Sequence, residues 1–150
     1  MCLRVFVATS RHVDPPAPSV DFDVRAMPDT RERTGWLGDH VLEVIANGCA
    51  CGFNANGVAW TSGAMLRSEI DGLENALAAD ERDELDRSLA SCTALAVLIT
   101  RALDDGAVRI WVSYFGEEET EARALAPRRL SELTDALAPF EPHTVFDVIV

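Results

Sequence analysis

The feature that most constrains the fold is a long amphipathic segment in the middle of the chain. Between residues 81 and 103, apolar side chains recur at steps of three and four positions, at Leu85, Leu89, Cys92, Ala96, Ile99 and Leu103. This spacing is typical of an α-helix with one buried face. Asp80 is the expected N-cap and Gly106 the expected stop. The segment therefore predicts a helix of about 34 Å, which needs an apolar surface to cover.

Segments with the composition of β-strands stand on both sides of this helix. β-branched and aromatic residues dominate them, as expected for strands. We predict strands at residues 3–9, 20–26, 40–46, 107–115 and 144–150. The second of these alternates strictly between apolar and polar residues, which indicates a strand with one solvent-facing side near a sheet edge. Leu130, Leu133 and Leu137 share one face of residues 127–138 and predict a second, shorter helix.

Together these elements predict an α/β fold in a single domain over residues 1–150, with a mixed sheet of about five strands and two main helices packed mostly on one face. The order strand–helix–strand–helix–strand in the second half predicts that the strands at 40–46, 107–115 and 144–150 run parallel. The strands at 3–9 and 20–26 are joined without a helix, which favours local antiparallel pairing.

The charge of the chain excludes several classes of partner. The net charge is −12, and all 13 basic residues are arginine. Binding to nucleic acid or to an anionic membrane needs a basic face, so we expect neither partner. No apolar stretch approaches the roughly 20 residues that span a bilayer, and Arg4 interrupts the only N-terminal apolar run, which lacks a cleavage site for secretion. We therefore expect a cytoplasmic protein.

The four cysteines are expected to be free thiols or metal ligands, because the cytoplasm keeps thiols reduced. Cys49 and Cys51 occur in the sequence ANGCACGF, directly after a predicted strand. The glycines of this turn permit left-handed backbone and close approach of amides, so two thiolates can face one ion. With Cys2 as a third thiolate and one further ligand, the set suits tetrahedral zinc. Cys92 belongs to the apolar stripe of the helix and is predicted to be core.

The carboxyl ends of parallel strands form the usual ligand-binding edge of an open α/β sheet. The segment after residue 46 and the segment after residue 115 are both expected at that edge. We therefore predict a pocket that contains Asn47, Cys49, Cys51, Tyr114 and Glu117.

The direction of the first strand decides whether Cys2 belongs to this pocket. Cys2 can approach Cys49 and Cys51 only if the first strand runs antiparallel to the strand at 40–46. His40 and His143 stand at the starts of their strands. We therefore predict both histidines at the opposite edge, about 20 Å away for a strand of seven residues.

The chain also resembles a group of short bacterial proteins. The resemblance is carried by the opening MCLRVFVATS, by the GCACGF turn and by VRIWVSYFGEE, a strand that ends in a glycine followed by acidic residues. Members of the group begin Met-Cys and carry a Cys-x-Cys-Gly-Phe turn. The resemblance extends over nearly the whole chain, implies a bacterial protein and directs attention to Cys2, Cys49 and Cys51. It implies no activity, because none is established for the group.

The residues leave several functions open and specify no reaction. The cysteines can be structural, since free cysteine is often simply buried. The alternatives are a zinc-binding module using Cys2, Cys49 and Cys51, a cysteine-dependent enzyme, and a non-catalytic interaction or scaffold protein that forms a homodimer through an exposed strand edge. For the enzyme, the glycine turn could supply amides that lower a thiol pKa, but it contains no basic residue and the acidic residues 117–119 would raise that pKa, so the sequence leaves this alternative undecided. Zinc is a possible cofactor, and the sequence identifies no other.

Overall fold

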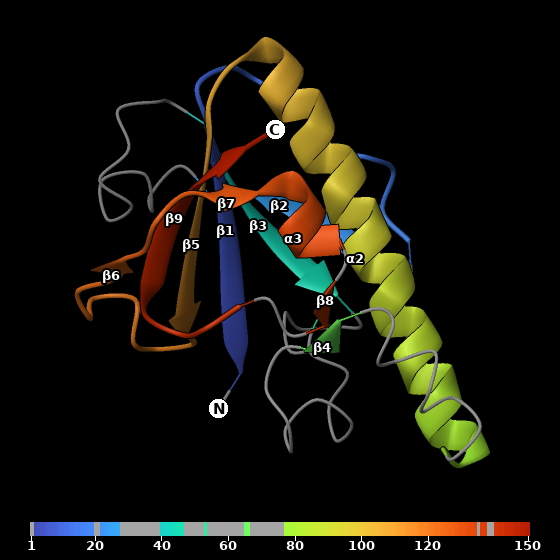
Figure 1. Ribbon diagram of the computed structural model, residues 1–150. Helices are drawn as coiled ribbons and strands as arrows, with labels where there is room; N and C mark the ends of the chain where they lie inside the picture. Colours follow the sequence, from blue (N-terminus) through green and yellow to red (C-terminus); the bar gives the residue numbers. More distant parts are fainter. Residues whose placement is uncertain are drawn as a thin grey trace.

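The protein is built on a mixed β-sheet with one long helix lying across it (Figure 1). The computed structural model describes residues 2–19, 22–27, 40–46, 53, 65–66, 77–134, 136–137 and 140–150. These contain helices α2 (Ala79–Asp105) and α3 (Leu130–Thr134). They contain strands β1 (Leu3–Thr9), β2 (Phe22–Ala26), β3 (His40–Ala46), β4 (Met65–Leu66), β5 (Val108–Tyr114), β6 (Arg123–Ala124), β7 (Arg128–Arg129), β8 (Ala136–Leu137) and β9 (Thr144–Ile149).

The order of strands in the main sheet is β2–β3–β1–β5–β9–β6, with β7 also paired to β9. Neighbouring strands from β2 to β9 are antiparallel, whereas β6 and β7 run parallel to β9. The predicted mixed sheet is therefore confirmed. Over the described residues it has seven strands rather than about five, because the two-residue strands β6 and β7 extend it past β9. Strands β4 and β8 form a separate pair.

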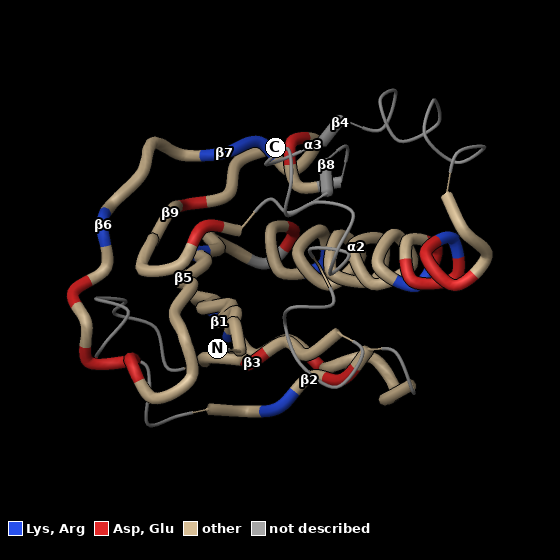
Figure 2. The backbone as a smooth tube through the Cα atoms, turned by 90° about the horizontal axis from the view of Figure 1, so that it is seen from below, with Lys and Arg blue, Asp and Glu red and all other residues tan. Residues whose placement is uncertain are grey.

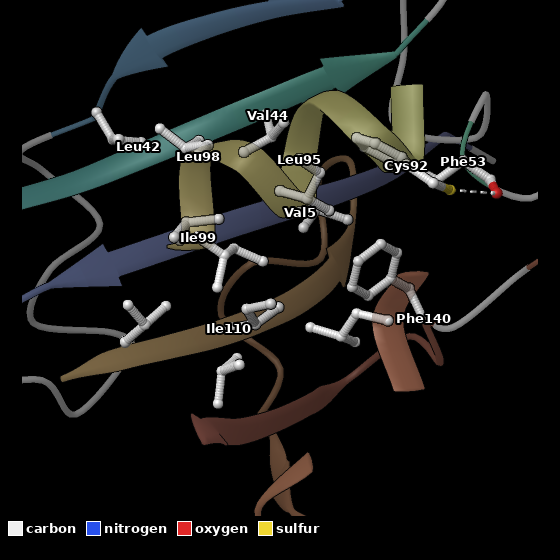
Figure 3. Packing of buried hydrophobic residues seen from close by; sticks show 14 of the residues in the cluster. Val5, Leu42, Val44, Phe53, Cys92, Leu95, Leu98, Ile99, Ile110 and Phe140 are labelled. Carbon is white, nitrogen blue, oxygen red and sulfur yellow. Dashed lines mark hydrogen bonds between the residues drawn. The ribbon is translucent and has the colours of Figure 1, made fainter. Parts of the chain in front are cut away.

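Both helices pack on the same face of the sheet, as predicted (Figure 1). Alternation along β1 divides its side chains between the two faces: Val5 packs under α2, whereas Phe6 faces the other side and stacks on Trp111 at 4.7 Å between ring centroids. The layer between the sheet and α2 includes Val5, Val44, Leu95, Leu98, Ile99 and Ile110 (Figure 3). Each buried aliphatic side chain contributes about 1.5–3 kcal/mol, so this layer is the main source of stability.

The start of α2 differs slightly from the prediction. The helix begins at Ala79, and the backbone N–H of Ala78 donates a hydrogen bond to the Glu81 carboxylate at 2.8 Å. Glu81 thus satisfies a backbone group at the helix start, as in half of a capping box. Asp80 is not the N-cap but lies in the first turn, where the helix dipole favours a carboxylate.

The buried face of α2 is wider than the predicted stripe. Leu85, Cys92 and Ile99 are buried as predicted, whereas Leu89 and Leu103 are only partly buried. The rest of the buried face is formed by Ser88, Ser91, Leu95, Leu98 and Ala102. A helical stripe that packs on a sheet covers about 100° of the helix surface. The predicted residues lie along one side of the buried face, whereas the buried face of α2 also includes the residues on its other side.

The order of the chain after β5 corrects the prediction of three parallel strands. Strands β3 and β5 do run in the same direction, on either side of β1. Strand β9 is antiparallel to β5. After β5 the chain returns beside β9 as β6 and β7, and the backbone at 128–129 pairs with β9. The pairing of residues 128–129 with β9 limits the predicted helix at 127–138 to α3. The antiparallel pairing with β5 places the start of β9 beside the end of β5.

Strand β2 lies at the edge of the sheet, as its alternating sequence predicts. Its backbone donors are partly occupied by nearby side chains. The N–H of Val24 donates to the carboxylate of Asp23 at 2.9 Å, and the N–H of Phe22 donates to Ser19 Oγ at 3.0 Å. These bonds make the edge a poorer template for pairing with another strand.

Candidate functional site

One edge of the sheet brings together the ends of β3 and β5 and the starts of β1 and β9. We call it the β3/β5 edge and define it by Cys2, Ala46, Tyr114, Glu117 and His143. At this edge the carbonyl of Cys2 accepts a hydrogen bond from the N–H of Phe115 at 2.8 Å, which continues the β1–β5 ladder. Strand β1 is antiparallel to β3, so the condition that places Cys2 beside the end of β3 is met.

Three of the predicted site residues are described at this edge. Cys2 is a free, exposed cysteine. Tyr114 is partly buried and packs against the core under α2. Glu117 lies in the turn after β5, where its N–H donates to the carbonyl of Tyr114 at 3.0 Å and its carbonyl accepts from Ser113 Oγ at 3.1 Å. The backbone of Glu117 is therefore fixed, and its carboxylate projects from an anchored turn.

The other predicted site residues, Asn47, Cys49 and Cys51, lie outside the described residues. The chain on both sides of them is well anchored. Ala46 ends β3, Phe53 belongs to the main core, and neither exposes any surface. The segment 47–52 is thus a connection between two buried residues.

The position of His143 corrects the prediction that this residue lies at the opposite edge. Because β9 is antiparallel to β5, its start lies beside the end of β5. His143 Nε2 is 3.1 Å from Glu117 Oε2, and the imidazole packs edge-on against the Tyr114 ring at 5.5 Å between centroids. His40 does lie at the opposite edge, paired with Thr9. His143 therefore contacts both Tyr114 and Glu117, the two described residues that were predicted for the pocket from β5 and the turn after it.

The backbone of His143 is unusual for a residue with a side chain. Its φ is 56°, in the left-handed region that glycine and asparagine occupy most readily. The residue follows Pro142 in a turn in which Thr144 Oγ1 donates to the carbonyl of Glu141 at 2.6 Å. Within the described part of the chain, His143 Nδ1 is buried and has no hydrogen-bond partner. The fold thus holds this imidazole at a cost in conformational and solvation energy.

A second cluster at this edge, on the face of the sheet away from α2, is centred on Arg4. Arg4 Nε is 2.6 Å from Glu43 Oε1, and Arg4 Nη1 forms an ion pair with Glu118. The guanidinium also lies over Phe6 and Phe115, at 4.8 and 5.6 Å from the ring centroids. The three charged side chains expose only 12–16% of their surface. The cluster ties β1, β3 and the turn after β5 together.

The Arg4 cluster changes the electrostatics that the sequence alone indicates. The pKa of Arg4 is raised, mainly by the hydrogen bond with Glu43. Burial acts to raise the pKa of Glu118, but hydrogen bonds from Arg4 and from backbone N–H groups outweigh it, so that pKa lies below its ordinary value. With Glu118 paired to Arg4, the acidic segment 117–119 is partly compensated.

Cys92 is separate from this edge chemistry. It is 4% exposed, and burial raises the pKa of its thiol to about 12. Its Sγ donates a weak hydrogen bond to the carbonyl of Phe53 at 3.9 Å (Figure 3). The prediction that Cys92 is a core residue is confirmed, and its thiol is unsuited to bind a metal ion at neutral pH.

The described residues alone do not complete a metal centre. Among them, no three side chains of histidine, cysteine, aspartate or glutamate are grouped so that they could hold an ion. A centre at this edge therefore needs further ligands from residues such as 47–52. None of the described helices is both long and apolar enough to cross a membrane. In comparisons with protein families, curated proteins and solved structures, nothing matches this chain.

Proposed function

We propose that this protein binds a zinc ion at the β3/β5 edge through the thiolates of Cys2, Cys49 and Cys51. The observation that carries the proposal is the antiparallel pairing of β1 with β3. In this arrangement Cys2, directly before β1, lies beside the end of β3, the strand that leads into the Cys-x-Cys sequence. A parallel pairing would have put Cys2 at the far end of the sheet, and the three thiols could not have shared an ion.

The chemistry of the donor set favours zinc over harder ions. Thiolates prefer zinc and other soft or borderline metals, whereas calcium and magnesium require oxygen ligands. Cys49 and Cys51 stand between Gly48 and Gly52, so the backbone of the turn has the freedom that a two-thiolate chelate requires. Ala46 and Phe53 anchor the two ends of the connection. Anchoring reduces the conformational entropy that ligand binding would otherwise remove.

The charge of the edge also favours a cation. Figure 2 shows acidic residues along the chain between β5 and β6, which begins at the β3/β5 edge. The whole chain carries a formal charge of −12. Three cysteine thiolates without a metal would add to this negative charge, whereas a bound divalent cation offsets it. The negative charge of the chain therefore disfavours a free cysteine thiolate and favours a thiolate that is bound to a metal cation.

The proposal is tested by zinc titration against a chromophoric competitor, using protein purified without an affinity tag. We expect one tight site in the wild type, and a loss of at least tenfold in affinity for each of Cys2→Ser, Cys49→Ser and Cys51→Ser. Cys92→Ala is the matched control, because Cys92 is buried in the core, and its affinity should equal that of the wild type. Wild-type protein that binds no zinc, or three serine variants with wild-type affinity, would contradict the proposal.

A further inference from the structure

We draw no further inference here: the strongest candidate, the arginine-rich surface patch on β6 and β7 at the edge of the sheet, carries nothing because two of its arginines, Arg123 and Arg128, already pair with Glu141 and nothing in the described part of the chain shows what covers it.

Discussion

At the start of β5, Arg109 makes two hydrogen bonds to Asp147, the residue directly opposite in β9. Near the end of β5, Arg4 of the adjacent strand joins Glu43 and Glu118, which come from two other segments. The Arg109 pair exposes 31% and 45% of its side chains, but each member of the Arg4 cluster exposes 16% or less. The first is a cross-strand surface pair. The second is a buried connection on which the β3/β5 edge depends.

The largest effect expected from this comparison is that of Arg4→Met. It leaves the carboxylates of Glu43 and Glu118 buried without their cation, which should lower the free energy of unfolding by about 3 kcal/mol. Arg109→Met is the control, because it removes the exposed ion pair between β5 and β9, and it should cost at most about 1 kcal/mol, since its partner is solvated. Urea unfolding measures both. Equal losses in the two variants would remove the distinction between the two clusters.

Glu118→Gln sharpens the comparison and should cost about 2 kcal/mol at neutral pH, the worth of a charged hydrogen bond. Because the folded pKa of Glu118 lies below its unfolded value of about 4.3, its contribution is fully present above that pH. It is lost as the pH falls through the lower folded pKa. In unfolding measured from pH 7 to pH 3, Glu118→Gln should therefore lose less stability than the wild type. Parallel curves would show that Glu118 contributes nothing specific.

The smallest effect expected is at the opposite edge, where Gly106 packs closely against Ser10. A Cβ at residue 106 would lie 1.9 Å from Ser10 Oγ, which accepts a hydrogen bond from the N–H of Ala107 at 3.1 Å. Gly106→Ala should displace Ser10 and cost about 1 kcal/mol, the worth of that hydrogen bond. Thermal unfolding measures the loss, and zinc affinity should be unchanged. A Gly106→Ala protein as stable as the wild type would show that Ser10 moves without cost.

The elements of the fold were predicted correctly from the sequence where a local hydrophobic pattern determines the secondary structure. The spacing of Leu85, Cys92 and Ile99 predicted α2, and the alternation in β2 predicted an edge strand; both are confirmed. The direction of β9 was predicted wrongly. In place of a helical crossover, the connection from β5 to β9 contains β6 and β7, which have two residues each and pair with β9. Segments this short carry no periodicity of their own, so sequence patterns could not indicate them.

Residues of the candidate site were predicted at the correct edge only where the direction of their strand was predicted correctly. Tyr114 and Glu117 were placed at the correct edge because Tyr114 ends β5 and Glu117 follows it, whereas the error in the direction of β9 placed His143 at the wrong edge. The sequence did contain one overlooked indication of the Arg4 cluster. An arginine within an apolar strand implies a buried partner, but Glu43 and Glu118 lie 39 and 114 residues away and no local pattern identifies them.

The central claim, that the start of β1 supplies a thiolate to the same ion as the turn after β3, is tested most directly by X-ray absorption at the zinc edge. The account predicts about three sulfur ligands near 2.3 Å in the wild type, with one sulfur fewer in Cys2→Ser. A zinc ion surrounded only by oxygen and nitrogen, or an unchanged sulfur count in Cys2→Ser, would contradict it.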